Sequence, residues 1–258
     1  MNWLFMMGSL ATGMVVGSFL NVCIYRLPRQ ESLVYPGSHC PKCGTPVRPY
    51  DNIPILSYLL LKGRCRKCRQ SISPRYPLVE ALTGGVALAL AGRYGWAPET
   101  PIFFLLCCGL IVISFIDLDH QIIPNRITYP GIPLGILASF LIPGVTLEDS
   151  LLGMALGGGI LWLVAIVFQW VRKKEGMGFG DVKLLAMIGA FLGWKAVILT
   201  LVLSSFVGAV VGYAALRLSG KDVREPIPFG PFLALGALVY MLGGEELVQW
   251  YLTLGKAP

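Results

Sequence analysis

The sequence predicts an all-α polytopic membrane protein. Of its 258 residues, 55% are hydrophobic and only 14% are charged, and the mean hydropathy is +0.68. The charged residues leave long uncharged windows at 1–25, 100–116, 127–147, 150–171, 196–216 and 226–244. A helix that crosses a bilayer needs about 20 apolar residues. These windows therefore predict membrane spans and exclude a soluble enzyme, a disordered tail and a small disulfide-rich scaffold.

Basic residues give the predicted orientation. Residues 26–75 hold ten lysines and arginines against two acidic residues, and basic residues that flank a span stay in the cytoplasm. We therefore expect a cytoplasmic loop at 26–76 and an external N-terminus. Threading from there gives about eight transmembrane helices, near 2–25, 77–93, 100–117, 127–146, 151–171, 182–194, 196–216 and 227–244. On this path 18 basic residues lie inside and three lie outside, and the run 172–174 is expected to contact anionic membrane lipids.

Two of these spans are weaker than the others. Glu80 lies near the start of the span at 77–93, and 182–194 offers only about a dozen uncharged residues between Lys183 and Lys195. At about 1.5 Å per residue the second of these helices reaches roughly 18–20 Å, which is short of a hydrocarbon core about 30 Å thick. It would tilt little, thin the bilayer locally or begin in a water-filled cavity.

The first segment, 1–25, resembles a signal peptide only in being apolar. It has no basic n-region and no clear small-residue cleavage site, and its length suits a complete crossing. We expect a retained first transmembrane helix. Gly13 and Gly17 form a small-xxx-small pair that suits close packing against another helix.

Four cysteines in the cytoplasmic loop predict a metal site. Cys40 and Cys43 form one Cys-x-x-Cys pair, Cys65 and Cys68 form another, and 21 residues separate the pairs. Two such knuckles complete a tetrahedral site for structural zinc, with no ligand position left open for catalysis. The alternatives are a pair of disulfides, which a cytoplasmic loop disfavours, or unligated thiols. His39 is a possible substitute ligand.

Two aspartates are the candidates for catalysis. Asp117 ends the span at 100–117 and Asp181 precedes the span at 182–194, so the predicted threading places both at the cytoplasmic membrane face. Carboxylates near a bilayer are costly and suggest function. Two carboxyl groups a few ångströms apart share one proton, so that one activates water while the other polarises a carbonyl, as in aspartic proteases. The structural alternative is that they cap helices or pair with Arg126 and Lys183.

Two other classes of protein fit the sequence less well than an aspartic protease. A proton-coupled transporter would hold its carboxylates near the middle of a span, whereas these lie at span ends. A basic zinc module that binds nucleic acid would interleave aromatic and basic residues, yet none of the loop tyrosines lies within the basic run 62–69. We therefore expect no nucleic-acid partner.

The order of motifs resembles that of the bacterial type IV prepilin peptidases. The resemblance covers nearly the whole chain. It rests on 17–28 (GSFLNVCIYRLP), the two Cys-x-x-Cys pairs, 73–80 (SPRYPLVE), 117–125 (DLDHQIIPN), 178–181 (GFGD) and 228–232 (PFGPF). Presenilin-like proteases share the Gly-x-Gly-Asp element alone, so a presenilin-like intramembrane protease is the nearest alternative enzyme.

The resemblance implies a bifunctional enzyme of the bacterial inner membrane. Such enzymes cleave the basic leader of a prepilin or pseudopilin after a glycine at the cytoplasmic face. Many then N-methylate the new N-terminus with S-adenosylmethionine. Carried onto this sequence, the catalytic pair is Asp117 and Asp181, with a peptidase core at about 100–216. Asp117 is preferred to Asp119 because the family's aspartate lies six residues before an Ile-Pro pair, here Ile123-Pro124.

Methylation rests on the resemblance alone, because the sequence has no glycine-rich motif for S-adenosylmethionine. Candidate residues would lie in the N-terminal third, near Asn21, Arg26 and Glu80, without assigned roles. The expected domains are the first helix at 1–25, the zinc loop at 26–76 and the transmembrane bundle at 77–258.

Overall fold

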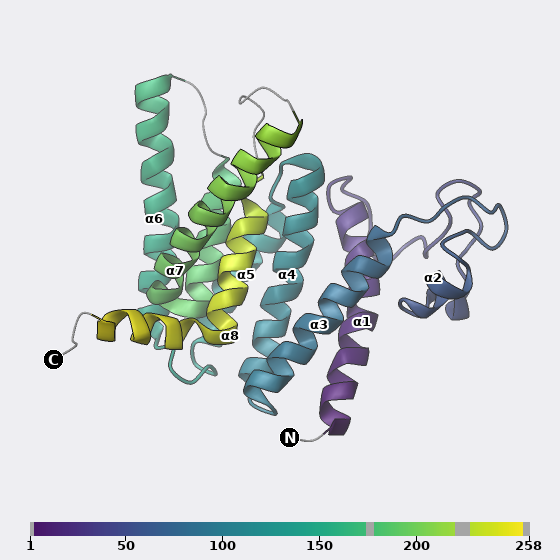
Figure 1. Ribbon diagram of the computed structural model, residues 1–258, viewed down its shortest axis with the longest axis horizontal. Coiled ribbons are helices and arrows are strands. Elements are labelled where there is room, and N and C mark those ends of the chain that lie inside the picture. The colour runs from purple at the N-terminus through teal and green to yellow at the C-terminus, as the bar shows by residue number, and fades with distance from the viewer. Residues whose placement is uncertain (1–2, 174–177, 220–227, 255–258) are drawn as a thin grey trace. The chain divides into compact units, whose positions relative to one another are not determined.

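The computed structural model describes residues 3–173, 178–219 and 228–254. Lys174, which belongs to the predicted lipid-contacting run, lies outside these residues. The described chain contains helices and no strands, apart from two isolated bridges, which confirms the all-α prediction. The helices are α1 (Trp3–Arg26), η1 (Pro49–Asn52), α2 (Leu56–Leu60), α3 (Arg75–Tyr94), α4 (Glu99–His120), α5 (Asn125–Ala138), α6 (Leu147–Arg172), α7 (Phe179–Ser219) and α8 (Gly230–Leu254) (Figure 1).

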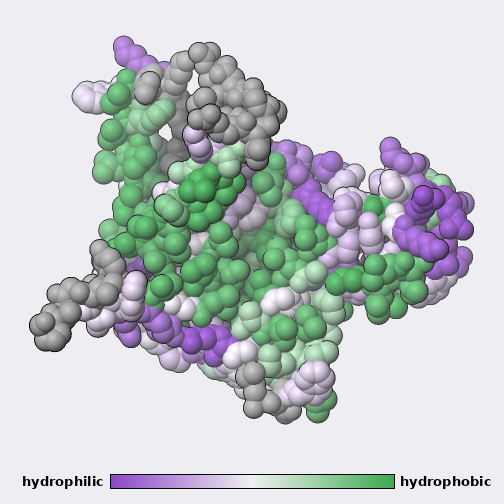
Figure 2. Space-filling view, in the orientation of Figure 1, coloured by the Kyte–Doolittle hydropathy of each residue, from purple (hydrophilic) through white to green (hydrophobic). Residues whose placement is uncertain are grey.

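Five of the described helices are long and apolar enough to cross a membrane, namely α1, α4, α6, α7 and α8. The chain is therefore a multi-pass membrane protein. Two of the predicted spans, which correspond to α3 and α5, fall outside this set, and α7 covers two others. The count of eight spans stays a prediction. Apolar residues cover much of the visible helix surface, whereas hydrophilic residues gather over the loop that carries α2 (Figure 2).

Helix α5 is shorter than the span predicted at 127–146. It ends at Ala138, and the next residues form turns. Pro143 and Gly144 explain the difference, because proline removes a backbone donor and Gly144 adopts a left-handed conformation with φ of 85°. Helix α6 then begins earlier than predicted, since Thr146 and Asp149 form a reciprocal capping box at its N-terminus.

The chain divides into two compact units, residues 1–112 and 113–258. In the first unit α1 packs along α3. The predicted glycine pair makes this contact: a Cβ added at Gly17 would lie 2.8 Å from Cα of Glu80, and one at Gly13 would lie 2.8 Å from Cα of Gly84. Side-chain-free positions let the two backbones approach this closely, so the predicted packing role of the pair is confirmed.

In the second unit α6 and α7 run antiparallel over another glycine contact. Gly153 faces Gly189, and Gly157 faces Leu185 one turn further along. Helix α5 lies on α7 in the parallel sense, since Gly131 meets Met187 and Gly135 meets Phe191. The N-terminal ends of α5 and α7 therefore lie at the same end of this unit.

Helix α7 turns back on itself at Gly193, where φ is 79° and ψ is 176°. A Cβ added at Gly189 would lie 2.8 Å from Cγ2 of Val197. Residues eight apart in a straight helix are separated by about 12 Å, so this contact requires a sharp turn between them. The two limbs, 179–192 and 194–219, correspond to the separate helices that the sequence predicts near 182–194 and 196–216.

Candidate active site and metal centre

Asp117 lies in the last turn of α4, and its carboxylate accepts a hydrogen bond from a residue far along the sequence. Its side chain is only 5% exposed. The backbone N–H of Gly230, the first residue of α8, donates to Oδ2 of Asp117 at 2.9 Å. A Cβ at position 230 would lie 2.8 Å from the same oxygen. Glycine is therefore the residue that lets this backbone donor reach the carboxylate without displacing it.

Asp181 lies in the first turn of α7 and is 9% exposed. Its backbone N–H donates to the carbonyl of Gly178 at 3.2 Å. Gly180 packs on Ile123, which precedes α5, at a distance that leaves no room for a side chain. The charge of Asp117 acts electrostatically on Asp181. The ends of α4, α7 and α8 thus gather the two predicted carboxyl groups in one buried site of the second unit.

The neighbouring polar residues do not form the ion pairs of the structural alternative. Lys183 donates to Oδ1 of Asn125 and lies 5.1 Å from the ring centroid of Tyr129. No ion pair of Asp117 or Asp181 with a lysine or arginine occurs in the described chain. Asp119 and His120 are exposed. Of the two aspartates at the end of α4, only Asp117 is buried.

The four loop cysteines form a cluster in the first unit. The Sγ atoms of Cys40, Cys43, Cys65 and Cys68 all lie within 4.8 Å of one another, and Cys40 and Cys68 are 3.8 Å apart. A Zn–S bond of about 2.3 Å in a tetrahedron gives sulfur–sulfur edges of about 3.8 Å. The donor set and its spacing therefore fit zinc. His39 is outside the cluster, and its Nδ1 lies 3.0 Å from the carbonyl of Gly37.

The two knuckles repeat one backbone pattern. The N–H of Cys40 donates to Thr45 and its carbonyl accepts from Gly44, while Cys65 makes the same bonds with Gln70 and Arg69. Gly44 and Arg69 both adopt left-handed conformations, with φ of 67° and 59°. Hydrogen bonds with Thr45 lower the pKa of Cys43 to about 6, whereas burial and the neighbouring cysteines raise the pKa of Cys68 to about 11.

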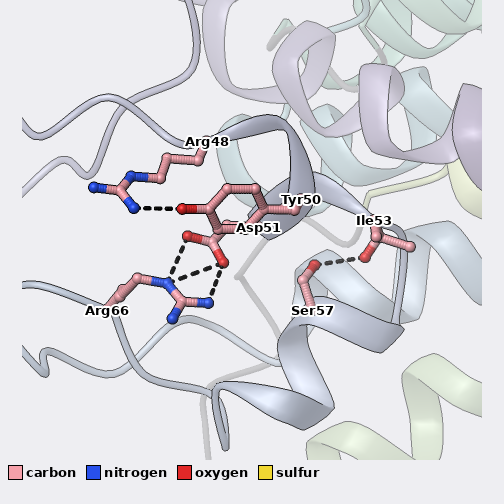
Figure 3. A network of polar contacts seen from close by, with 6 residues as sticks. All are labelled: Arg48, Tyr50, Asp51, Ile53, Ser57 and Arg66. Atoms are coloured by element: carbon pink, nitrogen blue, oxygen red, sulfur yellow. Dashed lines mark hydrogen bonds and ion pairs between the residues drawn. The ribbon is translucent and has the colours of Figure 1, made fainter.

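Arg66, which lies within the second Cys-x-x-Cys pair, forms an ion pair with Asp51. Its guanidinium makes bidentate hydrogen bonds with Asp51, at 2.6 Å and 2.9 Å for the shortest contact of each carboxylate oxygen (Figure 3). This ion pair lowers the pKa of Asp51. Arg48 donates to the hydroxyl of Tyr50 in the same network. The network joins η1 to the second knuckle and so connects the two halves of the loop.

A pocket of about 1070 Å³ opens in the first unit. Its wall includes Asn21, Arg26 and Glu80, the three residues that the resemblance marked without assigning roles, and reaches Cys40 and Cys65 of the cluster. Each of these three polar side chains is at most 7% exposed. Sequence reasoning missed two contacts: the Gly230 amide on Asp117, and the N–H of Ile55, which donates to Oε2 of Glu80 at 2.8 Å.

Comparisons with known proteins match both units. The Bacterial Peptidase A24 N-terminal domain matches residues 11–94, and the Type IV leader peptidase family matches residues 104–213. A prepilin leader peptidase/N-methyltransferase of Pseudomonas aeruginosa is 40% identical over 96% of this chain and 93% of its own length. Proteins of the same name from Stutzerimonas stutzeri and Aeromonas salmonicida are each 39% identical over at least 97% of this chain and 95% of their own. No solved structure matches.

The matched regions contain the two sites. Asp117 and Asp181 lie within the leader peptidase match, and the four cysteines and Glu80 lie within the N-terminal match. The chain belongs to the type IV leader peptidase family of membrane proteases.

Proposed function

We propose that this protein is a membrane aspartic endopeptidase that removes the basic leader of a type IV prepilin or pseudopilin after a glycine, and that it N-methylates the new N-terminal residue with S-adenosylmethionine. One observation carries the peptidase: Asp117 and Asp181, far apart in the chain, share a buried site at the ends of three helices. Burying two acidic groups together is costly, so a protein that does so has a functional reason.

The geometry supports a two-carboxyl mechanism. The pair holds a water, one ionised carboxyl group takes its proton, and the other, protonated, polarises the scissile carbonyl. Oδ2 of Asp117 accepts the N–H of Gly230, so the shared proton resides on Oδ1 of Asp117 or on Asp181. The amide fixes one oxygen of the pair and thereby orients the others toward the substrate.

The orientation follows from the distribution of basic residues. With the loop 26–76 in the cytoplasm of a bacterium, the aspartates lie at the inner face of the cytoplasmic membrane. A prepilin has its basic leader in the cytoplasm and an apolar helix in the bilayer, so its scissile bond lies in that layer. Zinc on the four cysteines would supply folding energy to the loop, which is only moderately apolar.

Cleavage of a prepilin by purified protein in lipid tests the peptidase. Asp117→Asn and Asp181→Asn should each lower the cleavage rate at least a hundredfold, because each removes a carboxyl group that moves a proton. The matched control is Asp119→Asn, which changes an exposed acid two residues from Asp117 and should cleave at close to the wild-type rate.

The substrate in this assay separates the alternatives. Shortening of the prepilin at its leader glycine, with no cleavage of a transmembrane peptide that lacks a basic leader, supports a leader peptidase. Cleavage of both would favour a presenilin-like protease. Full activity of either active-site variant would refute the assigned pair. Wild-type protein that cleaves neither substrate would refute the peptidase and favour the transporter, which proton flux into proteoliposomes would then test.

A further inference from the structure

We infer that the pocket of the first unit is the methyl-transfer site, and that Glu80 holds the amine of the trimmed substrate and accepts its proton. This inference rests on the proposed N-methyltransferase activity and assigns it a place. The aspartate pair occupies the second unit, whereas the pocket is lined entirely by residues of the first. Its volume of about 1070 Å³ is at the upper end for small-molecule sites, which leaves room for a nucleoside donor beside a peptide terminus.

Glu80 is a buried acid without a basic partner. It is 7% exposed, and its Oε2 accepts a hydrogen bond from the N–H of Ile55 at 2.8 Å. No lysine or arginine of the described chain forms an ion pair with it. Burying a carboxylate is costly unless it is protonated or gains a positively charged partner. Both reactants of N-methylation, a sulfonium donor and an N-terminal ammonium, bring positive charge.

Two other buried polar residues of the pocket already make hydrogen bonds within its wall. The guanidinium of Arg26 donates to the carbonyls of Ser32 at 2.8 Å and Pro36 at 2.6 Å, so it holds the loop after α1. Asn21 donates to the carbonyl of Tyr76 at 3.1 Å and joins α1 to α3. Glu80 is therefore a buried acidic residue of the pocket that no ion pair within the described residues neutralises.

Backbone strain at Ile55 indicates that its contact with Glu80 has a function. Ile55 has φ of 60° and ψ of −50°, a conformation that a β-branched residue strongly disfavours. Such strain costs of order 1–3 kcal/mol and tends to collect at functional sites, where the surroundings enforce it. Here the strained residue aims its N–H at Oε2 of Glu80, which fixes the carboxylate in the pocket wall.

The chemical step balances with the groups named. The ammonium of the trimmed substrate first gives a proton to the Glu80 carboxylate. The nitrogen lone pair then forms a bond to the donor methyl carbon, and the carbon–sulfur bond breaks with its electron pair remaining on sulfur. The products are a secondary ammonium and the neutral thioether S-adenosylhomocysteine, and Glu80 releases its proton to solvent. Tyr25, Tyr35 and Tyr76 line the same pocket and offer aromatic faces to a cationic or nucleoside ligand.

The test uses the full protein in lipid, with a prepilin and labelled S-adenosylmethionine. Glu80→Gln keeps the size of the side chain and removes its charge. Methyl transfer should fall at least a hundredfold, the magnitude expected for loss of a general base, while leader cleavage stays within threefold of wild type. The control is Glu99→Gln, the same change in the same unit but outside the pocket, and it should methylate normally.

A binding measurement separates a catalytic role from a structural one. The photoreactive donor 8-azido-S-adenosylmethionine should label peptides within 18–80 of the wild-type protein, and Glu80→Gln should retain that labelling. Loss of labelling together with methylation would make Glu80 a structural residue of the wall and overturn its assignment. Labelling of 113–258, or normal methylation by Glu80→Gln, would overturn the site.

The same experiment distinguishes this inference from the proposed function. Wild-type protein that cleaves the leader but neither transfers a methyl group nor takes the label would refute the methyltransferase proposal, and the pocket assignment with it. Wild-type protein that methylates while the label maps outside the pocket would refute the pocket assignment alone. Because labelling of the wild type requires no substitution, the result does not depend on whether a variant folds.

Discussion

At the scale of single residues, the aspartate site depends on a hydrogen bond from the backbone rather than from a side chain. The N–H of Gly230 reaches Asp117 across 113 residues of sequence. Gly230 belongs to the PFGPF motif, which the sequence marks without giving it a role. Its function is clear only when the start of α8 is seen against the end of α4. The contact is possible because Gly230 has no side chain.

Gly230→Ala tests this positioning role. The added Cβ would lie 2.8 Å from Oδ2 of Asp117, so the carboxylate must shift. A displacement of about 1 Å at a catalytic group lowers the rate about a hundredfold, and we expect that loss in kcat, with little change in KM. The pH profile of cleavage should shift as well, since the hydrogen bond to the carboxylate is disturbed.

The matched control is Gly243→Ala in the same helix. A Cβ there meets no atom within 4 Å, and φ of −178° is open to any residue. Cleavage should stay at the wild-type rate. An unchanged kcat and pH profile in Gly230→Ala would show that this amide does not orient the aspartate.

At the scale of elements, glycines determine how closely the helices approach. The contact between Gly153 of α6 and Gly189 of α7 leaves no space for a side chain on either residue. It lies one turn of α7 before the reversal at Gly193, so it fixes the position of the limb 179–192, which carries Asp181 in its first turn. Helix propensity alone would favour alanine at these positions, and packing overrides it.

Gly189→Ala should therefore destabilise the protein despite its better helix propensity. The new methyl group would meet the carbonyl of Gly153 and Cγ2 of Val197, and overpacking of this kind costs about 1–3 kcal/mol. Thermal unfolding in detergent should show the loss as a lower midpoint. Gly159→Ala on α6, where a Cβ meets nothing within 4 Å, should unfold at or slightly above the wild-type temperature. Equal midpoints for the two variants would argue against close packing at Gly189.

At the scale of the whole molecule, the two candidate sites belong to different compact units. The cysteine cluster and the pocket lie within residues 1–112, and the aspartate pair lies within 113–258. Each unit has its own internal contacts and its own family match. The two chemical steps of the proposed function are thus assigned to separate parts of one chain.

Loss of the metal should therefore destabilise the first unit and leave the second unit intact. Cys40→Ser removes one of four thiolate ligands, so zinc content measured by atomic absorption should fall from about one per chain to well below it. The loop should become more sensitive to proteolysis, because metal binding contributes to its folding. Leader cleavage should continue, since both aspartates lie outside this unit. Cys23→Ser, a change to a buried cysteine outside the cluster, should retain its zinc, and unchanged zinc in Cys40→Ser would refute the four-cysteine site.

The sequence by itself determined the features that depend on local pattern. Uncharged windows gave the apolar helices because a bilayer requires them, and each Cys-x-x-Cys pair shaped its own knuckle because four residues suffice to form one. Tertiary structure decided everything that needs distant backbone to meet. The end of α5 escaped prediction because an apolar run continues through the turn at Pro143, and hydropathy does not record backbone direction. The contacts of the Gly230 amide with Asp117 and of the Ile55 amide with Glu80 use backbone N–H groups, which every residue except proline carries. Only folding therefore shows which of these groups are used.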